Sequence, residues 1–205
     1  CVANKAGAVT IGLSGYPDSL TAQTAQFYLV YYHADEWYQD PSLVHCNSQG
    51  TALKIAAELL RRYENWSKYD KMMEAFEQLP SIYGAAYEKA KPLAVKFGMR
   101  YQNDTVWNVL ASGATFESAY SDAFCFFQEM QTVHCVPCHS GEYFHGAFET
   151  TDENLAVLLL KGVGRTRPLD ERAEHFLEQF GGHHYILDAA QYGLDQLDPA
   201  VAEYF

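Results

Sequence analysis

The order of apolar and polar positions along the chain predicts strands and helices that alternate. Residues 106–111 form an apolar run of the kind found in strands that are covered on both faces. Between such runs, apolar residues recur with helical spacing. Strands are predicted at residues 8–13, 27–32, 106–111, 154–160 and 183–188 and around residues 133–138. Helices are predicted at residues 20–26, 51–66, 69–79, 81–97, 116–130 and 169–180.

This alternation predicts an α/β chain built on parallel sheets with flanking helices. A crossover between parallel strands needs a dozen or more residues, and a helix supplies them. Pro80 is expected to end the helix at residues 69–79, because proline disfavours helical backbone in the residue before it. The Leu-Pro step is therefore the expected boundary between two domains, residues 1–80 and residues 81–205.

A loop of small residues follows the strand at residues 106–111. Ser112, Gly113 and Ala114 let the backbone turn sharply, and Thr115 is the expected N-cap of the next helix. Open α/β sheets bind ligands at the carboxyl ends of their strands. Ser112, Gly113 and Thr115 are therefore expected to bind the substrate.

Glu129, in the last turn of the helix at residues 116–130, is the first candidate for chemistry. Its helix is expected to pack through apolar side chains that leave Glu129 among aromatic residues. Desolvation and the negative end of the helix dipole both disfavour a charged carboxylate, which suits a general base. The alternative is a solvent-exposed glutamate at a helix end. The packing residues are expected to be Ala119, Ala123, Phe126, Phe127 and Met130.

His145 is the second candidate, in the turn Gly-Glu-Tyr-Phe-His-Gly at residues 141–146. A histidine in a turn can move protons near neutral pH. A polar surface histidine is the alternative. Glu142, in the same turn, is expected to contact the substrate.

Together these residues resemble the sugar isomerase (SIS) domain. The resemblance rests on a strand ending in Ser-Gly, a helix ending in Gln-Glu-Met, a strand containing Val-His-Cys, and the motif Gly-Glu-x-x-His-Gly. It covers the second SIS copy of two-domain sugar-phosphate enzymes, and the sixteen residues from Glu129 to His145 match its spacing. It implies a flavodoxin-like fold in which Glu129 moves a proton between sugar carbons and His145 helps to open the ring.

Departures from the family pattern narrow the implied activity. In the SIS domains of glucosamine-6-phosphate synthase, the pattern has a lysine where this chain has Phe126. It usually also has a basic residue and a proline where this chain has Phe144 and Ala147. These losses favour the deglycase branch, which splits a fructosamine 6-phosphate such as fructoselysine 6-phosphate or glucoselysine 6-phosphate into an aldose phosphate and an amine. An aldose-ketose isomerase and a non-catalytic sugar-phosphate regulator remain alternatives.

The resemblance also implies how the protein is organised. No metal or organic cofactor is expected, and a homo-oligomer is expected in which the histidine serves a neighbouring subunit's site. Residues 1–80 would be the C-terminal part of a first SIS domain, and residues 81–205 a second one whose tail is cut. The loops that hold the sugar phosphate would precede the chain.

Charge and composition exclude several other classes of protein. A formal net charge of -12 argues against nucleic acid as a partner, because lysine and arginine hold phosphate backbones. No apolar run approaches the roughly 20 residues of a membrane span. The first residues lack the apolar core of a signal peptide, so the cytoplasm is the expected location.

Three short segments carry further hypotheses. Cys135 and Cys138 form a Cys-x-x-Cys flanked by histidines, but residues three apart in a strand point to opposite faces, which favours structural thiols over a metal or redox site. Arg165 and Arg167 either bind phosphate or form a solvated turn. The acidic pair at residues 35–36 either touches a substrate amine or belongs to a surface connection.

Overall fold

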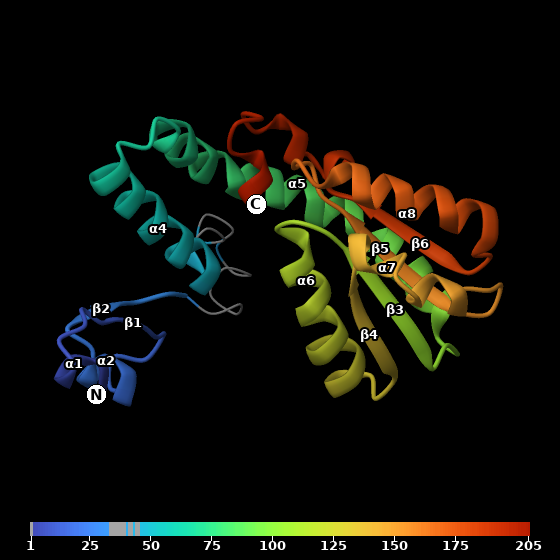
Figure 1. Ribbon diagram of the computed structural model, residues 1–205, viewed down its shortest axis with the longest axis horizontal. Helices are drawn as coiled ribbons and strands as arrows, with labels where there is room; N and C mark the ends of the chain where they lie inside the picture. Colours follow the sequence, from blue (N-terminus) through green and yellow to red (C-terminus); the bar gives the residue numbers. More distant parts are fainter. Residues whose placement is uncertain (1, 33–39, 41–42, 44–45) are drawn as a thin grey trace. The chain divides into compact units, whose positions relative to one another are not determined.

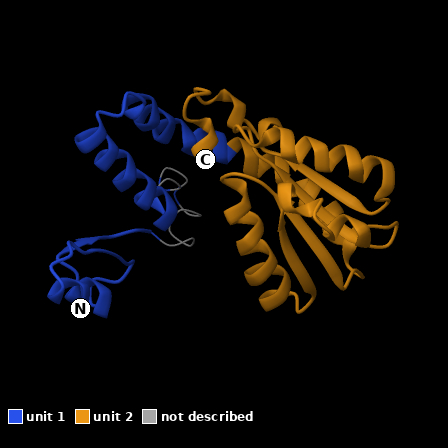
Figure 2. Ribbon diagram, in the orientation of Figure 1, with its two compact units in different colours: residues 1–84 blue, residues 85–205 orange. Residues whose placement is uncertain are grey.

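The computed structural model describes residues 2–32, 40, 43 and 46–205 (Figure 1). The acidic pair at residues 35–36 lies outside the described residues. The chain divides into two compact units, residues 1–84 and 85–205 (Figure 2). Among the described residues, none of the helices combines the length and the apolarity that a bilayer crossing needs.

The first unit begins with short elements and one longer helix. They are α1 (Val2–Lys5), β1 (Ile11–Leu13), α2 (Leu20–Thr24), β2 (Phe27–Leu29) and the longer α4 (Ser48–Glu64). Strands β1 and β2 are parallel, as predicted, although each is shorter than its apolar run. The Ser19 hydroxyl caps α2 by accepting a hydrogen bond from the backbone N–H of Ala22.

Helix α5 (Tyr69–Tyr101) runs through Pro80, so the predicted break at that residue is wrong. Proline in a helix interior removes one hydrogen bond and costs about 3 kcal/mol relative to alanine. Burial of apolar side chains on both sides of Pro80 offsets that cost, with Met72 and Phe76 before it and Tyr101 after it. The two units divide inside this helix, and the assignment of the two parts to two SIS domains stays a prediction.

The second unit is built on a parallel sheet of four strands in the order β4-β3-β5-β6. The predicted strand at residues 106–111 is confirmed as β3 (Val106–Ala111), and all the pairings are parallel, as predicted. The order reverses at β3, because β4 lies on one side of it and β5 on the other, as in doubly wound flavodoxin-like folds. The other strands are β4 (His134–His139), β5 (Ala156–Lys161) and β6 (His184–Asp188).

Helices cover both faces of this sheet (Figure 1). On one face, Val109 and Ala111 of β3 share a buried cluster with Tyr101 of α5 and Ala119 of α6 (Thr115–Ser121). On the other, the intervening Leu110 packs with residues of α7 (Ser140–Tyr143) and α8 (Arg167–Phe180). Successive side chains of β3 point to opposite faces of the sheet and therefore pack into two separate cores. Short helical turns complete the unit, at η3 (Ala147–Thr150), η4 (Ala189–Tyr192), η5 (Leu194–Gln196) and η6 (Ala202–Tyr204).

Helix α6 continues as a π-helix, η2 (Asp122–Met130), which the apolar spacing did not predict. Ala123 is fully buried there and Phe127 packs against the core, as predicted. Phe126 and Met130 are 52% and 64% exposed, so their predicted packing is wrong. The reason is geometric, because a π-helix bonds residues five apart and its wider turn rotates side chains away from the positions that α-helical spacing gives them.

Candidate functional site

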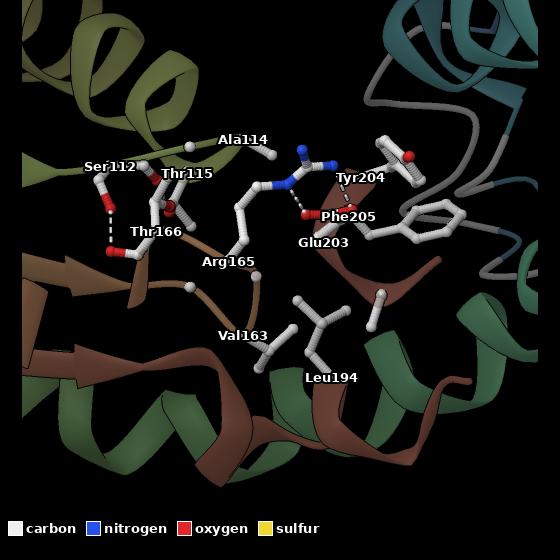
Figure 3. Close-up of a pocket in the computed structure, with 14 residues that line it drawn as sticks. Ser112, Ala114, Thr115, Val163, Arg165, Thr166, Leu194, Glu203, Tyr204 and Phe205 are labelled. Carbon is white, nitrogen blue, oxygen red and sulfur yellow. Dashed lines mark hydrogen bonds and ion pairs between the residues drawn. The ribbon is translucent and has the colours of Figure 1, made fainter. Parts of the chain in front are cut away.

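A cavity of about 310 Å³ opens at the carboxyl edge of the sheet, where the strand order reverses between β3 and β5 (Figure 3). We call it the edge cavity. Two loops form it, residues 112–115 after β3 and residues 162–166 after β5, together with Leu194 and residues 202–205. Three of the four predicted substrate-binding residues line it, namely Ser112, Gly113 and Thr115.

Hydrogen bonds fix the loop after β3. The buried Ser112 donates from Oγ to the backbone oxygen of Thr166 at 3.2 Å, which ties the two cavity loops together (Figure 3). Thr115 donates from Oγ1 to the backbone oxygen of Ser112 at 2.7 Å. The prediction that Thr115 is the N-cap is wrong, because the cap is Ala114, which has no capping side chain, and Thr115 is already helical.

Gly113 is required by both its backbone and its surroundings. Its φ of +59° lies in the left-handed region, which side chains strain. A Cβ at this position would lie 2.5 Å from Oγ1 of Thr166 in the facing loop. A Cβ at Gly164 would similarly lie 2.7 Å from Cβ of Glu203. Glycine therefore lets the walls of the edge cavity approach one another closely.

Arg165 of the loop after β5 and Arg167, the first residue of α8, are both held by carboxylates of the same unit. Arg165 forms two hydrogen bonds of 2.7 Å to Glu203 (Figure 3). Arg167 donates to both carboxylate oxygens of Asp188, at 2.8 and 2.6 Å, and to the backbone oxygen of Gly162 at 2.9 Å. In this structure these guanidinium groups stabilise the loop.

Asp188 lies at the centre of a largely buried ionic network beneath this loop. Its side chain is 9% exposed, and the hydrogen bonds from Arg167 hold its pKa below the ordinary value. Lys161 lies 3.5 Å from the same carboxylate and also forms an ion pair with Glu174. These ion pairs therefore hold together the end of β5, the start of α8 and the end of β6.

Glu129 is exposed near the end of η2, so its predicted desolvated setting is wrong. Its helix is a π-helix there, so the α-helical spacing from which that setting was predicted does not hold. The preceding residue, Gln128, donates from Nε2 to the backbone oxygen of Cys135 at 2.7 Å and anchors the helix end to β4. A second cavity, of about 450 Å³, is lined in part by Phe126, Phe127 and Gln131. Glu129 does not line this cavity.

His145 follows α7 in a tight turn. The backbone N–H of His145 donates to the oxygen of Glu142 at 2.8 Å, and Gly146 follows with a φ of +153°, which favours glycine. The turn is anchored by Tyr143, whose side chain is fully buried. His145 and Glu142 are both exposed, and neither lines the edge cavity.

Glu129 and His145 lie toward opposite ends of β4. Glu129 is on η2, which ends just before β4 begins, and His145 follows α7, which starts where β4 ends. A strand of this length spans roughly 17–20 Å. The two side chains of one chain therefore do not meet on the same sugar carbon, and the structure leaves their predicted roles untested.

The two cysteines of β4 differ in burial. Cys135 is 4% exposed, and burial, with a further effect from the Asp122 charge, raises its pKa to about 12. Burial also raises the pKa of Cys138. Both shifts disfavour the reactive thiolate. In the part of the chain that the structure describes, no group of three or more His, Cys, Asp or Glu side chains is placed to hold a metal ion.

Several cavity residues carried no predicted role. Thr166 faces Ser112 and Gly113. Gly162 and Gly164 let neighbouring segments lie close to their backbone. The run Gly-Val-Gly-Arg-Thr directly after an apolar strand was the available signal, because it repeats the small-residue loop that follows β3. Glu203 carried no comparable signal, since it comes from a distant part of the sequence.

Comparison with known proteins relates nearly the whole chain to sugar-phosphate enzymes. No protein-family model matches. The chain is 34% identical over 198 residues to the fructosamine deglycase FrlB of Bacillus subtilis, a match that covers 97% of this chain and 59% of that protein. It is 23% identical over 185 residues to the fructoselysine 6-phosphate deglycase of Escherichia coli K12, covering 90% and 52%.

A solved structure from Salmonella typhimurium LT2, described as that of a phosphosugar isomerase, superposes with a TM-score of 0.93 at 33% identity. The superposition covers 100% of this chain and 62% of that one. The chain therefore spans less than two thirds of the length of each of these relatives.

Proposed function

We propose, from the premise that this chain is a homologue of the fructosamine and fructoselysine 6-phosphate deglycases and has the phosphosugar isomerase (SIS) fold, that the whole protein is a fructosamine 6-phosphate deglycase. The observation that carries the proposal is the 34% identity to a fructosamine deglycase over 97% of the chain. The motif residues Glu129 and His145 support the same reaction.

In the proposed reaction, Glu129 takes a proton from C1 of the open-chain ketosamine and returns a proton to C2. The intermediate enaminol is stabilised by the nitrogen of the substrate. The product of the transfer is an imine at C1, and one water molecule hydrolyses it to an aldose 6-phosphate and a free amine. His145 assists ring opening or protonates the departing amine. Neither a metal nor an organic cofactor takes part in this scheme.

The proposal includes a homo-oligomer in which Glu129 of one subunit and His145 of another serve one substrate. The positions of the two residues toward opposite ends of β4 support a shared site. Exposed apolar side chains on the helix that carries Glu129 support a covered surface there, with Tyr120 53%, Phe126 52% and Met130 64% exposed. The Ser112, Gly113 and Thr115 loop would bind part of the substrate. A cytoplasmic location follows from a phosphorylated substrate, which does not cross membranes unaided.

The decisive experiment is an assay of the full-length protein with fructoselysine 6-phosphate, glucoselysine 6-phosphate and fructose 6-phosphate. The deglycase proposal expects release of free amine together with an aldose phosphate. Interconversion of sugar phosphates without amine release would instead identify an isomerase, which the phosphosugar isomerase fold also accommodates. Binding without turnover would identify a regulator and would refute both enzymes.

Oligomerisation is tested separately. Mass measurement by light scattering is expected to give at least twice the mass of one chain. Mixing an inactive Glu129→Gln protein with an inactive His145→Gln protein under conditions of subunit exchange is expected to restore part of the activity, because some shared sites then contain both native residues. No recovery despite demonstrated exchange would contradict the shared site.

A further inference from the structure

The Arg172 guanidinium lies over the side chain that precedes His145. Arg172 is on α8, and its Cζ atom lies 3.8 Å from the centre of the Phe144 ring. The ring itself is fixed by edge contacts to Tyr143 and Phe176, with centroids 5.2 and 5.8 Å away. The cation is therefore held at a defined place beside the turn that carries His145.

Arg172 differs from the two arginines that precede it on the chain. Arg165 and Arg167 are each paired with carboxylates. Arg172 is exposed, and among the described residues no carboxylate forms an ion pair with it.

Stacking leaves the hydrogen-bonding capacity of a guanidinium intact. The aromatic ring contacts the flat face of the group, whereas its five N–H bonds lie in the plane and point outward. Such an edge pairs with two oxygens of one carboxylate or phosphate. The stack on Phe144 thus presents an oriented anion-binding edge at the turn that carries His145.

We propose that Arg172 binds an oxyanion of the substrate at the His145 end of the active site. The anion is either the phosphate of the sugar or a carboxylate on the amine portion. This inference rests on the proposed function, since it takes His145 as part of that site. Arg172 acts in binding and specificity, and the proton transfers stay with Glu129 and His145.

The test compares two ligands that differ in one anion. Amadori products of glucose 6-phosphate with glycine and with glycinamide share the phosphate, and only the first has a carboxylate. Their affinities are measured calorimetrically on full-length Glu129→Gln protein, with and without Arg172→Met. Binding to this variant does not require turnover, so the result stands even if the wild-type protein proves to be no deglycase.

We expect Arg172→Met to weaken binding about ten- to hundredfold, the range for loss of a charged hydrogen-bonding partner. A loss confined to the glycine product assigns the carboxylate, and an equal loss for both ligands, repeated with fructose 6-phosphate, assigns the phosphate. Arg172→Lys, which keeps the charge without the paired donors, is expected to fall between the two.

Arg100→Met is the matched control, because the Arg100 guanidinium also stacks on a ring, 5.1 Å from the centre of Tyr101, away from the His145 turn in sequence. It is expected to leave both affinities unchanged. Unchanged affinities in the Arg172→Met protein would overturn the inference. A lowered unfolding midpoint with unchanged affinities would assign Arg172 to packing alone.

Discussion

The loops of the edge cavity and the two candidate acid-base residues are built in opposite ways. Ser112, Thr166 and Arg167 are fixed by side-chain hydrogen bonds that cross from one loop or strand to another. Glu129 and His145 are exposed at the ends of their elements. The fold therefore prepares the shape of the cavity in advance, and it leaves the two acid-base groups in water.

This difference indicates where the remaining parts of an active site come from. A general base works best when water is excluded and the substrate is positioned. One isolated unit supplies positioning at the cavity loops and supplies no cover for Glu129. The proposed role of Glu129 requires cover from a neighbouring protein surface or from the substrate, which is why the proposed function includes a shared site.

The largest expected effect concerns the exposed candidate acid-base residues. Glu129→Gln is expected to lower the rate of amine release about a hundredfold or more, the usual contribution of a general base, with little change in stability because the side chain is exposed. Glu117→Gln is the control, an exposed glutamate on the same continuous helix. A rate within a few-fold of wild type would refute the role of Glu129.

The next effect concerns the loops of the edge cavity. Gly113→Ala is expected to lower the free energy of unfolding by about 2–4 kcal/mol, because it combines a left-handed backbone with a clash against Thr166. Urea denaturation measures it. Gly98→Ala, inside α5 with open space around it, is expected to be neutral or stabilising by up to about 1 kcal/mol. Equal effects of the two substitutions would contradict the close approach of the two cavity loops.

The smallest effect depends on pH. Asp188→Asn is expected to cost about 1–2 kcal/mol of unfolding free energy at neutral pH, because Arg167 and Lys161 lose their shared carboxylate. The native pKa of Asp188 is lowered, so its contribution is full above the unfolded pKa of about 3.9 and is lost as the pH falls through the native pKa.

Urea titrations of both proteins from neutral pH into the acid range measure this dependence. The difference between wild type and variant is expected to stay constant down to about pH 4–5 and to narrow below that. A difference that grows on acidification would show that the ion pair does not stabilise the loop.

Local patterns were sufficient for the sheet and insufficient for several helices. The apolar run at residues 106–111 coincides with β3, because a strand buried on both faces needs apolar side chains throughout. The prediction of a helix end at Pro80 was wrong, because tertiary packing on both sides of Pro80 outweighs the local preference of proline. A short stretch of sequence contains no information about that packing. The same limit applies to the π-helix, whose register no α-helical spacing can reveal.

The candidate site divides in the same way. Ser112, Gly113 and Thr115 could be predicted, because their position after a buried strand fixes them at the carboxyl edge of a parallel sheet. Glu203 and Thr166 could not, since their place in the cavity depends on tertiary folding. The exposure of Glu129 could not be predicted either, because Glu129 lies in the π-helix η2, where α-helical spacing does not apply.

The π-helix η2 has a consequence for how this protein can change over evolutionary time. A π-helical turn accommodates one more residue than an α-helical turn, while the elements on either side keep their places. Loss of a single residue within it would restore ordinary α-helical geometry and swing the Glu129 carboxylate to another side of the helix, with β3 and β4 undisturbed. The direction of that carboxylate is therefore an adjustable property of one short segment, independent of the sheet that supports it.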